Sequence, residues 1–398
     1  MSAAADAVAP ARTRGTVLVV GTGLLGASAG LALRARGVDV ALDDPSPTAR
    51  ALARDVGAGR LAGPDEDPDL VLGAAPPDVT ADVVAEQLLA HPRAVVTDVA
   101  SVKAAVLRGV TAALVRGGAD PAEARRYVGG HPMAGRERSG ATSARPDLFV
   151  GRPWVLVPPA AGPRADGAPD PLERVRALVD DCRGVPVVMA ADEHDEAVAV
   201  VSHVPQVAAS LVAARLLDVR DEAVALAGQG LRDVTRIAAS DPRLWVQILG
   251  ANAAPVARSL HALRDDLDEV LGALDALAAD VPPVPGDPAA AGPADGAVGA
   301  RARVARAIDA GGAGVARVPG KHGRAPVPYE VVVVLVPDEP GRLARLLHDV
   351  GDIGVNLEDL VLEHAQGRPV GLAEISVLPA ERPRLEAELP RRGWRVVG

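Results

Sequence analysis

Along the first half of the chain, short segments rich in apolar residues alternate with longer segments that have helical spacing. These apolar runs cover residues 16–20, 38–42, 70–77, 94–103, 126–135, 153–159 and 185–190. The first of them is unbroken, as is typical of a central parallel strand that is buried on both faces. The pattern therefore predicts an α/β domain, built on a mainly parallel sheet, over residues 14–190.

A glycine-rich turn follows the first run, in the stretch "TVLVVGTGLLGASAG". The spacing G-x-G-x-x-G allows a tight turn, a close approach of the backbone to a pyrophosphate, and close helix–strand packing. The helix that follows would point its N-terminal N–H groups at the phosphates. The sequence thus predicts a Rossmann-type dinucleotide-binding domain with the cofactor-binding residues Gly21, Gly23, Leu24, Leu25 and Gly26.

An acidic residue ends the second apolar run, as this fold requires for ribose recognition. Asp43 lies where a carboxylate would accept from both ribose hydroxyls and repel a 2′-phosphate, which favours NAD over NADP. Asp44 is the alternative candidate for this role.

Long helical periods replace the βα alternation from residue 191 onward. The stretch "EHDEAVAVVSHVPQVAASLVAARLLD" puts Ser202 and Gln206 four residues apart on one helix face, with a kink expected at Pro205. After residue 255, apolar residues recur in steps of four and three, and this seam needs a partner helix. We expect an all-α domain over residues 191–320, interrupted by a flexible Pro/Ala/Gly loop at 279–297.

The chain returns to strands near residue 329. Strand, helix, two strands, helix and strand follow one another within about seventy residues, which is the βαββαβ order of a small ferredoxin-like domain. Its expected bounds are residues 327–398.

Composition excludes several classes of partner and site. The formal net charge of −10 argues against nucleic acid or an anionic membrane surface as the main partner. The single cysteine, Cys182, excludes an internal disulfide framework and a thiolate zinc site, and no histidine pair shows metal-ligand spacing. No apolar run approaches the roughly 18 residues of a spanning helix, so we expect a soluble cytoplasmic protein.

One histidine stands out by position. His131 lies in "GGHPMAGRERSG", at the end of an expected strand, beside the loop that holds Ser101 and Lys103. Because a dinucleotide binds beyond the carboxyl ends of such strands, His131 is a candidate for proton transfer.

Six motifs in order resemble prephenate dehydrogenases that carry a C-terminal ACT domain. They are "GTGLLGAS", "DVASVK", "HPMAGRERSG", "VVSHVPQ", "GLRDVTRIAASDPRLW" and "PDEPGRLARLLHDVGDIGVNLEDL". The resemblance implies NAD+-dependent oxidative decarboxylation of prephenate to 4-hydroxyphenylpyruvate in tyrosine biosynthesis. It also implies a homodimer built from the helical domain.

The resemblance assigns roles to single residues. His131 matches the catalytic base, and Ser101 matches the serine that orients it. The substrate-binding matches are Arg236, which would grip a carboxylate, Trp245, which can reach the pocket of the neighbouring subunit, and Ser202 and His203 on the pocket helix. The role of Lys103 stays open. With an ordinary histidine as base, activity should fall as the pH drops through roughly 6.5.

The chain departs from the family at one substrate position. Gln206 stands where many members have the last histidine of S-H-x-P-H. Gln206 offers both a donor and an acceptor, so by itself it excludes neither prephenate nor arogenate, which differ in a keto or an ammonium group. Asp233 could supply a carboxylate for that ammonium, or it could pair with a neighbouring arginine. We expect prephenate to be preferred, with measurable arogenate activity.

The C-terminal domain suggests regulation. ACT domains commonly bind amino acids, and here we expect L-tyrosine at the loop that holds Gly354 and Asn356. The alternative is a domain that only adds dimer contacts.

Two other functions fit part of the sequence. A β-hydroxyacid dehydrogenase shares the layout but uses a catalytic lysine on its helical domain, and this chain has no lysine between Lys103 and Lys321. A non-catalytic amino-acid sensor would not need the intact glycine motif, His131 and Arg236.

Overall fold

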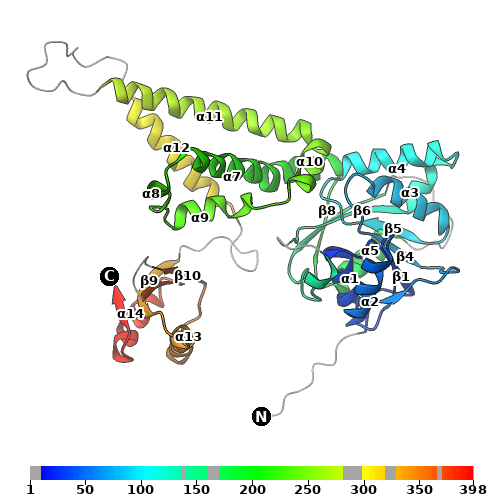
Figure 1. Cartoon of the computed structure of the whole chain (residues 1–398), viewed down its shortest axis with the longest axis horizontal. Helices are drawn as coiled ribbons and strands as arrows, with labels where there is room; N and C mark the ends of the chain where they lie inside the picture. Colours follow the sequence, from blue (N-terminus) through cyan, green and yellow to red (C-terminus); the bar gives the residue numbers. More distant parts are fainter. Residues whose placement is uncertain are drawn as a thin grey trace, which may run out of the picture. The chain divides into compact units, whose positions relative to one another are not determined.

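A computed structural model describes residues 10–135, 140–159, 170–280, 298–318, 329–364 and 370–397 of the chain (Figure 1). The chain divides into two compact units, Met1–Ala262 and Leu263–Gly398. The α/β domain and the helices directly after it therefore belong to one unit, and the C-terminal βαββαβ segment belongs to the other.

An eight-stranded sheet forms the centre of the first unit, in the order β3-β2-β1-β4-β5-β6-β7-β8. Neighbouring strands run parallel except β6 and β7, which are antiparallel. The strands are β1 (Thr16–Val20), β2 (Asp39–Asp43), β3 (Arg60–Leu61), β4 (Leu70–Gly73), β5 (Val95–Asp98), β6 (Tyr127–Pro132), β7 (Pro153–Val157) and β8 (Val185–Val188). Each predicted apolar run overlaps one of these strands, and only the two-residue β3 was missed.

Helices cover both faces of this sheet, which explains why most side chains of its central strands are apolar. They are α1 (Leu24–Arg34), α2 (Pro47–Asp55), α3 (Thr80–Ala90), α4 (Ala104–Arg116) and α5 (Pro171–Asp181). Successive side chains of β1 point to opposite faces: Val17 and Val19 pack in the core with α1 and α5, whereas Leu18 and Val20 pack in the core with α3 and α4. The expected Rossmann-type domain is thus confirmed.

A series of helices completes the first unit, and the boundary between the two units falls within the last of them. It comprises α6 (Ala191–Val198), α7 (Val204–Ala214), α8 (Asp221–Val224), α9 (Gln229–Thr235), α10 (Pro242–Ala251) and α11 (Ala253–Ala279). A π-helical turn, Ala199–His203, joins α6 to α7. It ends two residues before Pro205, which has no N–H to donate to the carbonyl four residues earlier. The kink expected at Pro205 therefore takes the form of a widened helical turn.

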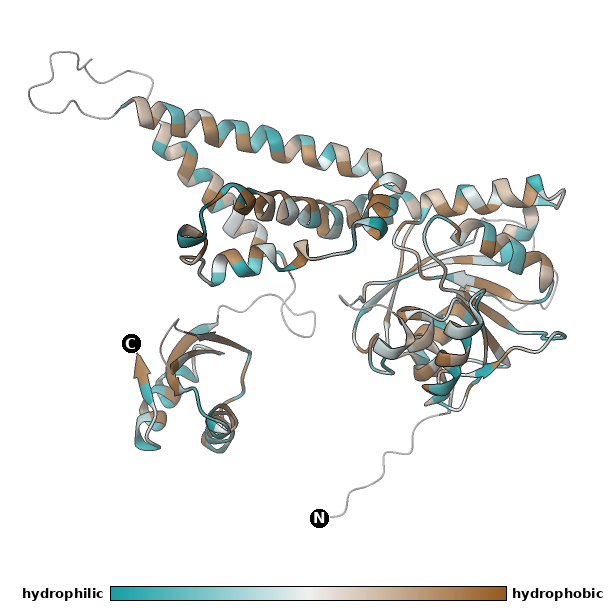
Figure 2. Cartoon of the chain, viewed as in Figure 1, coloured by the Kyte–Doolittle hydropathy of each residue, from teal (hydrophilic) through white to brown (hydrophobic). Residues whose placement is uncertain are grey.

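The surface of this continuous helix is unusually apolar (Figure 2). Residues Ala191–Asp218 are long and apolar enough to cross a membrane by length and composition alone. This differs from the expectation that no run reaches that length, because the part between Glu196 and Arg215 contains no charged residue and only a few polar ones, Ser202, His203, Gln206 and Ser210. Exposed Val201, Leu211 and Leu217 make it a surface that a partner helix can cover.

The second unit contains the C-terminal βαββαβ segment after helix α12 (Ala300–Val315). The segment consists of β9 (Glu330–Pro337), α13 (Arg342–Ile353), β10 (Asp359–His364), β11 (Val370–Val377), α14 (Arg382–Arg391) and β12 (Arg395–Val397). The sheet is antiparallel in the order β10-β11-β9-β12, and its core includes Val334, Leu346 and Leu385. The predicted element order is confirmed. Of the predicted flexible loop, residues 281–297 lie outside the described residues, and α11 already reaches Ala279.

Candidate functional site

The glycine turn after β1 has the geometry that a bound dinucleotide requires. Gly21 adopts a φ of +98°, and a Cβ there would lie 2.5 Å from the Ala74 carbonyl oxygen. A Cβ at Gly26 would lie 2.0 Å from the Gly21 carbonyl oxygen, so only glycine fits at both positions. A Cβ at Gly23 would meet no atom within 4 Å, which leaves the backbone open to a ligand just before the first residue of α1. These residues fit the pyrophosphate of NAD.

The two adjacent aspartates at the end of β2 have different partners. Asp44 accepts hydrogen bonds from the Thr22 N–H at 2.7 Å and the Thr22 hydroxyl at 3.0 Å, so it fastens the glycine turn. Asp43 pairs with Arg50 at 3.1 Å, and its side chain stays 45% exposed. Asp43 is thus the carboxylate available to a ribose, and Asp44, the alternative candidate, has a structural task.

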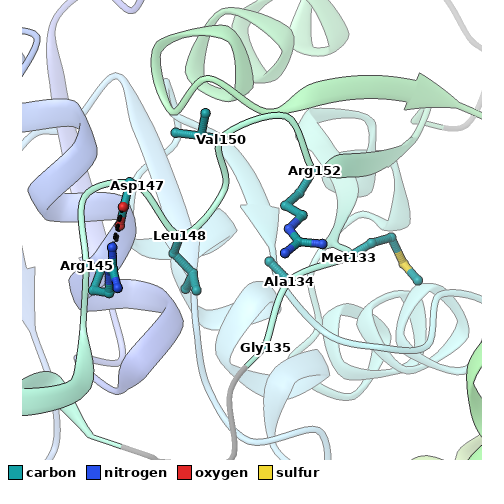
Figure 3. A pocket seen from close by; sticks show the side chains of 8 residues that line it. All are labelled: Met133, Ala134, Gly135, Arg145, Asp147, Leu148, Val150 and Arg152. Atoms are coloured by element: carbon teal, nitrogen blue, oxygen red, sulfur yellow. Dashed lines mark hydrogen bonds and ion pairs between the residues drawn. The ribbon is translucent and has the colours of Figure 1, made fainter. Parts of the chain in front are cut away.

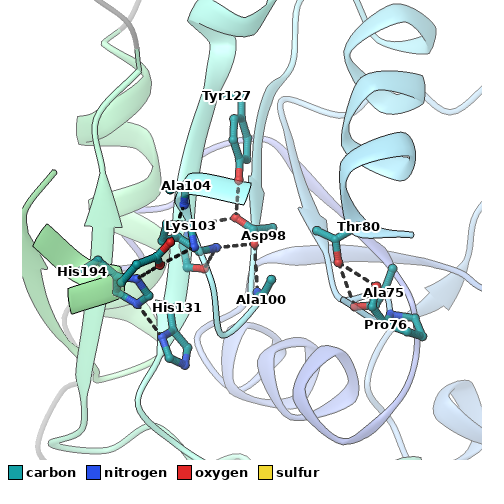
Figure 4. Close-up of polar contacts among 12 residues, drawn as sticks. Ala75, Pro76, Thr80, Asp98, Ala100, Lys103, Ala104, Tyr127, His131 and His194 are labelled. Atoms are coloured by element: carbon teal, nitrogen blue, oxygen red, sulfur yellow. Dashed lines mark hydrogen bonds and ion pairs between the residues drawn. The ribbon is translucent and has the colours of Figure 1, made fainter. Parts of the chain in front are cut away.

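A buried charge pair holds the ends of β5 and β6 together (Figure 4). The Lys103 ammonium, almost fully buried, donates to Asp98 and to the Gly130 carbonyl oxygen. Asp98 also accepts from the Tyr127 hydroxyl at 2.8 Å and the Gly130 N–H at 2.9 Å. Burial lowers the pKa of Lys103, although Asp98 opposes this. Lys103 therefore fixes the strand segment that directly precedes His131.

His131 is the first member of a hydrogen-bonded chain of side chains (Figure 4). Its Nδ1 lies 2.8 Å from Nε2 of His194, and Nδ1 of His194 lies 2.8 Å from an Asp195 carboxylate oxygen. Asp195 in turn accepts from the backbone N–H groups of Lys103 at 2.8 Å and Ala104 at 3.0 Å, at the start of α4. The chain ties strand β6 to helices α6 and α4.

The environment of His131 favours the neutral ring. Burial lowers the pKa of His131 well below its usual value, and the charges of His194, Lys103 and His203 lower it further. A neutral imidazole is the form that can accept a proton.

A second buried histidine lies on the helical side of the site. Nδ1 of His203 lies 3.1 Å from the Asn252 side-chain nitrogen, which also donates to the Asp195 carbonyl oxygen at 2.8 Å. Because an amide nitrogen only donates, Nδ1 of His203 accepts, and its Nε2 carries the proton. Burial lowers the pKa of His203 to about 4. The ring of Trp245 packs edge-on against His203 of the same chain, with centroids 6.0 Å apart.

Three other predicted site residues, Ser101, Gln206 and Arg236, differ in burial and in their partners. Ser101 follows β5 and is half-buried, but the partner that the structure gives to Nδ1 of His131 is His194. Gln206 is buried, and its amide lies within 3.5 Å of the hydroxyls of Ser210 and Ser240. Arg236 follows α9 on an exposed turn.

Five residues of the network were not predicted: Asp98, Tyr127, His194, Asp195 and Asn252. The sequence contained two patterns that could have drawn attention to some of these residues. His194 and Asp195 stand side by side in "EHDEAV", and Asp98 opens the motif "DVASVK". What the sequence lacks is any sign that His194 and His131, 63 residues apart, would meet.

An open cavity of about 510 Å³ adjoins the same edge of the sheet (Figure 3). Its walls come from the segment directly after β6 and the segment directly before β7: Met133, Ala134, Gly135, Arg145, Asp147, Leu148, Val150 and Arg152. Arg145 is paired with Asp147, and the Arg152 guanidinium points into the cavity (Figure 3). Among the described residues, no cluster of three or more His, Cys, Asp or Glu side chains is arranged to hold a metal ion.

Comparison with protein families gives two adjoining matches. The family model described as prephenate dehydrogenase, nucleotide-binding domain, matches residues 29–188. The model described as prephenate dehydrogenase, dimerization domain, matches residues 190–280.

Individual relatives agree with these matches. The chain is 39% identical to a probable prephenate dehydrogenase of Streptomyces niveus over 95% of this chain and 98% of the relative. Among solved structures, a prephenate dehydrogenase of Aquifex aeolicus in complex with hydroxyphenyl propionate and NAD+ is 27% identical, with a TM-score of 0.58 over 67% of this chain and 92% of that one. A Synechocystis arogenate dehydrogenase is 26% identical, with a TM-score of 0.54 over 65% and 92%.

Proposed function

Because the chain belongs to the prephenate dehydrogenase family, we propose that it catalyses the NAD+-dependent oxidative decarboxylation of prephenate to 4-hydroxyphenylpyruvate. The observation that carries this proposal is His131, a buried neutral imidazole at the end of β6. It lies at the edge of the sheet beyond which this fold binds the reactive part of a dinucleotide. Steady-state formation of NADH from prephenate is the direct test.

The chemistry needs one base and one acceptor of electrons. Prephenate is a cyclohexadiene with a ring hydroxyl on one carbon and a carboxylate on the opposite carbon. Bound NAD+ supplies the acceptor for the hydride that leaves the hydroxyl-bearing carbon. His131 accepts the hydroxyl proton through its free ring nitrogen. The ring carboxylate leaves as CO2, its bonding electrons enter the ring, and the ring becomes aromatic as a phenolate. Return of a proton to the phenolate oxygen gives 4-hydroxyphenylpyruvate and restores the neutral imidazole.

The substrate-binding residues follow from the same assignment. Arg236 grips a substrate carboxylate, because a guanidinium offers two parallel donors to one carboxylate. His203 is neutral with its proton on Nε2, so it donates a hydrogen bond there. Ser101 and Ser202 add hydroxyl contacts, and Trp245 forms a wall beside His203.

Prephenate is the proposed substrate in preference to arogenate. An ammonium group needs an acceptor, ideally a carboxylate, within the pocket. The candidate carboxylate from the sequence, Asp233, accepts from Gln229 at 2.7 Å and is exposed on α9. Gln206 offers a donor to a keto oxygen and retains an acceptor, so measurable arogenate activity remains part of the proposal.

Asp43 is the proposed determinant of cofactor choice. We expect Asp43→Ser to weaken NAD+ and to admit NADP+, because the variant removes the acceptor for the ribose hydroxyls and the charge that repels a 2′-phosphate. The released Arg50, 3.1 Å from Asp43, becomes available to that phosphate. The measurement is kcat/KM for both cofactors. Asp55→Ser, which alters an exposed pair with Arg54, is the matched control. Equal use of the two cofactors by the unmodified protein would show that Asp43 does not select.

The proposed assembly is a homodimer formed by the helical domain, in the cytoplasm. The match to a family dimerization domain over residues 190–280 supports it. The apolar exposed side chains of the helix over Ala191–Asp218 also support it, since a second subunit would bury them. Burial in a dimer contact would account for the apolar surface of this helix without placing it in a membrane.

The C-terminal segment is proposed to be an ACT domain that binds L-tyrosine as an effector. Its βαββαβ order and sheet order support the assignment. The loop after α13 contains Gly354, with a φ of +78°, and the Arg384 guanidinium lies 3.5 Å from where a Cβ of Gly354 would be. That guanidinium suits the carboxylate of an amino acid. The Asn356 amide donates to Glu358 at 3.0 Å and keeps its carbonyl oxygen for an ammonium.

A further inference from the structure

We propose that His194 and Asp195 are positioning residues that set the tautomer of His131, so that Nε2 of His131 is the atom that accepts the substrate proton. This inference rests on the proposed function for its catalytic meaning. Its structural content, the position of each ring proton, stands on the hydrogen-bond chain alone.

Asp195 sets the direction in which the hydrogen bonds run between Asp195, His194 and His131. Its two oxygens accept the backbone N–H groups of Lys103 and Ala104, at 2.8 and 3.0 Å. Backbone N–H groups can only donate, so neither oxygen is free to carry a proton toward them. Burial by itself would raise the pKa of Asp195, but the bonds from His194 and from the two N–H groups lower it below its usual value. Asp195 is therefore an ionised acceptor.

Because Asp195 accepts, it determines which nitrogen carries the proton, first in the His194 ring and then in the His131 ring. Nδ1 of His194, 2.8 Å from the carboxylate, must carry the proton that it donates. In a neutral ring, Nε2 of His194 then has only a lone pair. Nδ1 of His131, 2.8 Å from that lone pair, must donate, which leaves the lone pair of His131 on Nε2. The hydrogen bonds thus place the basic lone pair of His131 on the ring nitrogen that does not face His194.

The same chain stabilises the product of proton transfer. Once Nε2 of His131 is protonated, the ring is an imidazolium whose Nδ1–H bond to His194 becomes charge-assisted. The Asp195 carboxylate at the far end is the countercharge that His131 reaches through His194. His194 is fully buried, so water does not compete for these bonds.

The substitution Asp195→Asn is expected to reverse the donor and acceptor roles along these hydrogen bonds. With the amide oxygen kept on the Ala104 N–H, the amide nitrogen replaces the oxygen that faced both His194 and the Lys103 N–H, so the bond from Lys103 is lost. His194 must then accept at Nδ1 and donate from Nε2. His131 then accepts at Nδ1 and carries its proton on Nε2, where it blocks proton abstraction. We expect kcat to fall by about 10²–10⁴-fold, as when a comparable carboxylate is replaced in another histidine-based site, with KM for NAD+ unchanged. The matched control is Glu196→Gln, which alters an exposed pair with Arg258.

A pair of substitutions at His194 keeps the test independent of how Asp195→Asn folds. In His194→Gln the amide oxygen can still accept from Nδ1 of His131, so we expect turnover within about tenfold of the unmodified protein. In His194→Met no comparable acceptor remains, and kcat should fall by about 10²-fold or more. Equal turnover of the two variants, whether high or low, would overturn the positioning role.

Nitrogen-15 NMR of labelled histidine rings reads the tautomer without any activity. The His131 signals are identified by their absence from His131→Asn. We expect the chemical shift of an unprotonated Nε2 in the unmodified protein and of a protonated Nε2 in Asp195→Asn. A protonated Nε2 of His131 in the unmodified protein would overturn the inference even if the enzyme is active. A protein inactive on prephenate with an unprotonated Nε2 would overturn the proposed function and leave the inference standing.

Discussion

Replacing His131 by asparagine is expected to lower kcat by about 10²–10⁴-fold, which is the usual contribution of a general base. Asparagine retains a hydrogen-bonding side chain that can still face His194, but its amide has no basic nitrogen. Binding of NAD+ should stay nearly intact, because the glycine turn and Asp43 lie on other strands. Steady-state kinetics and cofactor titration measure the two effects separately. His348→Asn, at an exposed histidine of the second unit, is the matched control. Near-normal turnover would remove His131 from the mechanism.

The pH dependence of kcat/KM tests the same residue in the free enzyme. Protonated His131 cannot accept a proton, so activity falls as the pH drops through the pKa of His131. Since burial lowers that pKa well below its usual value, activity should persist as the pH falls through 6.5 and decline only at lower pH. This corrects the sequence-based expectation of a decline near 6.5, which assumed an exposed histidine. A half-maximal kcat/KM at pH 6.5 would contradict the lowered pKa of His131.

Lys103→Met is expected to reduce the free energy of unfolding by about 3–5 kcal/mol, because it leaves the Asp98 carboxylate buried without its countercharge. Asp98 and Lys103 are both almost fully buried. Urea unfolding followed by far-UV circular dichroism gives the change. The control is Arg116→Met, which breaks the exposed pair with Asp82 and should cost no more than about 1 kcal/mol. A cost for Lys103→Met as small as that of the control would show that the buried pair does not hold β5 to β6.

The elements that the sequence predicts well are those with a local physical signal. The strands of the first unit follow from apolar runs, and the glycine turn follows from steric demands that the structure displays at Gly21 and Gly26. Pro205 marked the position of a helix irregularity. Its form, a π-helical turn, depends on how the helix packs and was not predicted.

The parts of the site that escaped prediction depend on long-range contacts. His194 and His131 meet only because α6 packs beside β6, and no local pattern reports that contact. Lys103 attracted attention as one of only two lysines. A sequence does not say whether a lysine points to solvent or into the protein, so its pairing with Asp98 required the structure.

The measurement that tests the central claim most directly is steady-state turnover of prephenate and of arogenate with NAD+. We predict NADH formation from prephenate with release of one CO2 and one 4-hydroxyphenylpyruvate per NADH, and a higher kcat/KM for prephenate than for arogenate. A kcat/KM that favours arogenate tenfold or more, equivalent to about 1.4 kcal/mol, would contradict the proposed substrate. No NADH formation from either compound would contradict the proposed function itself.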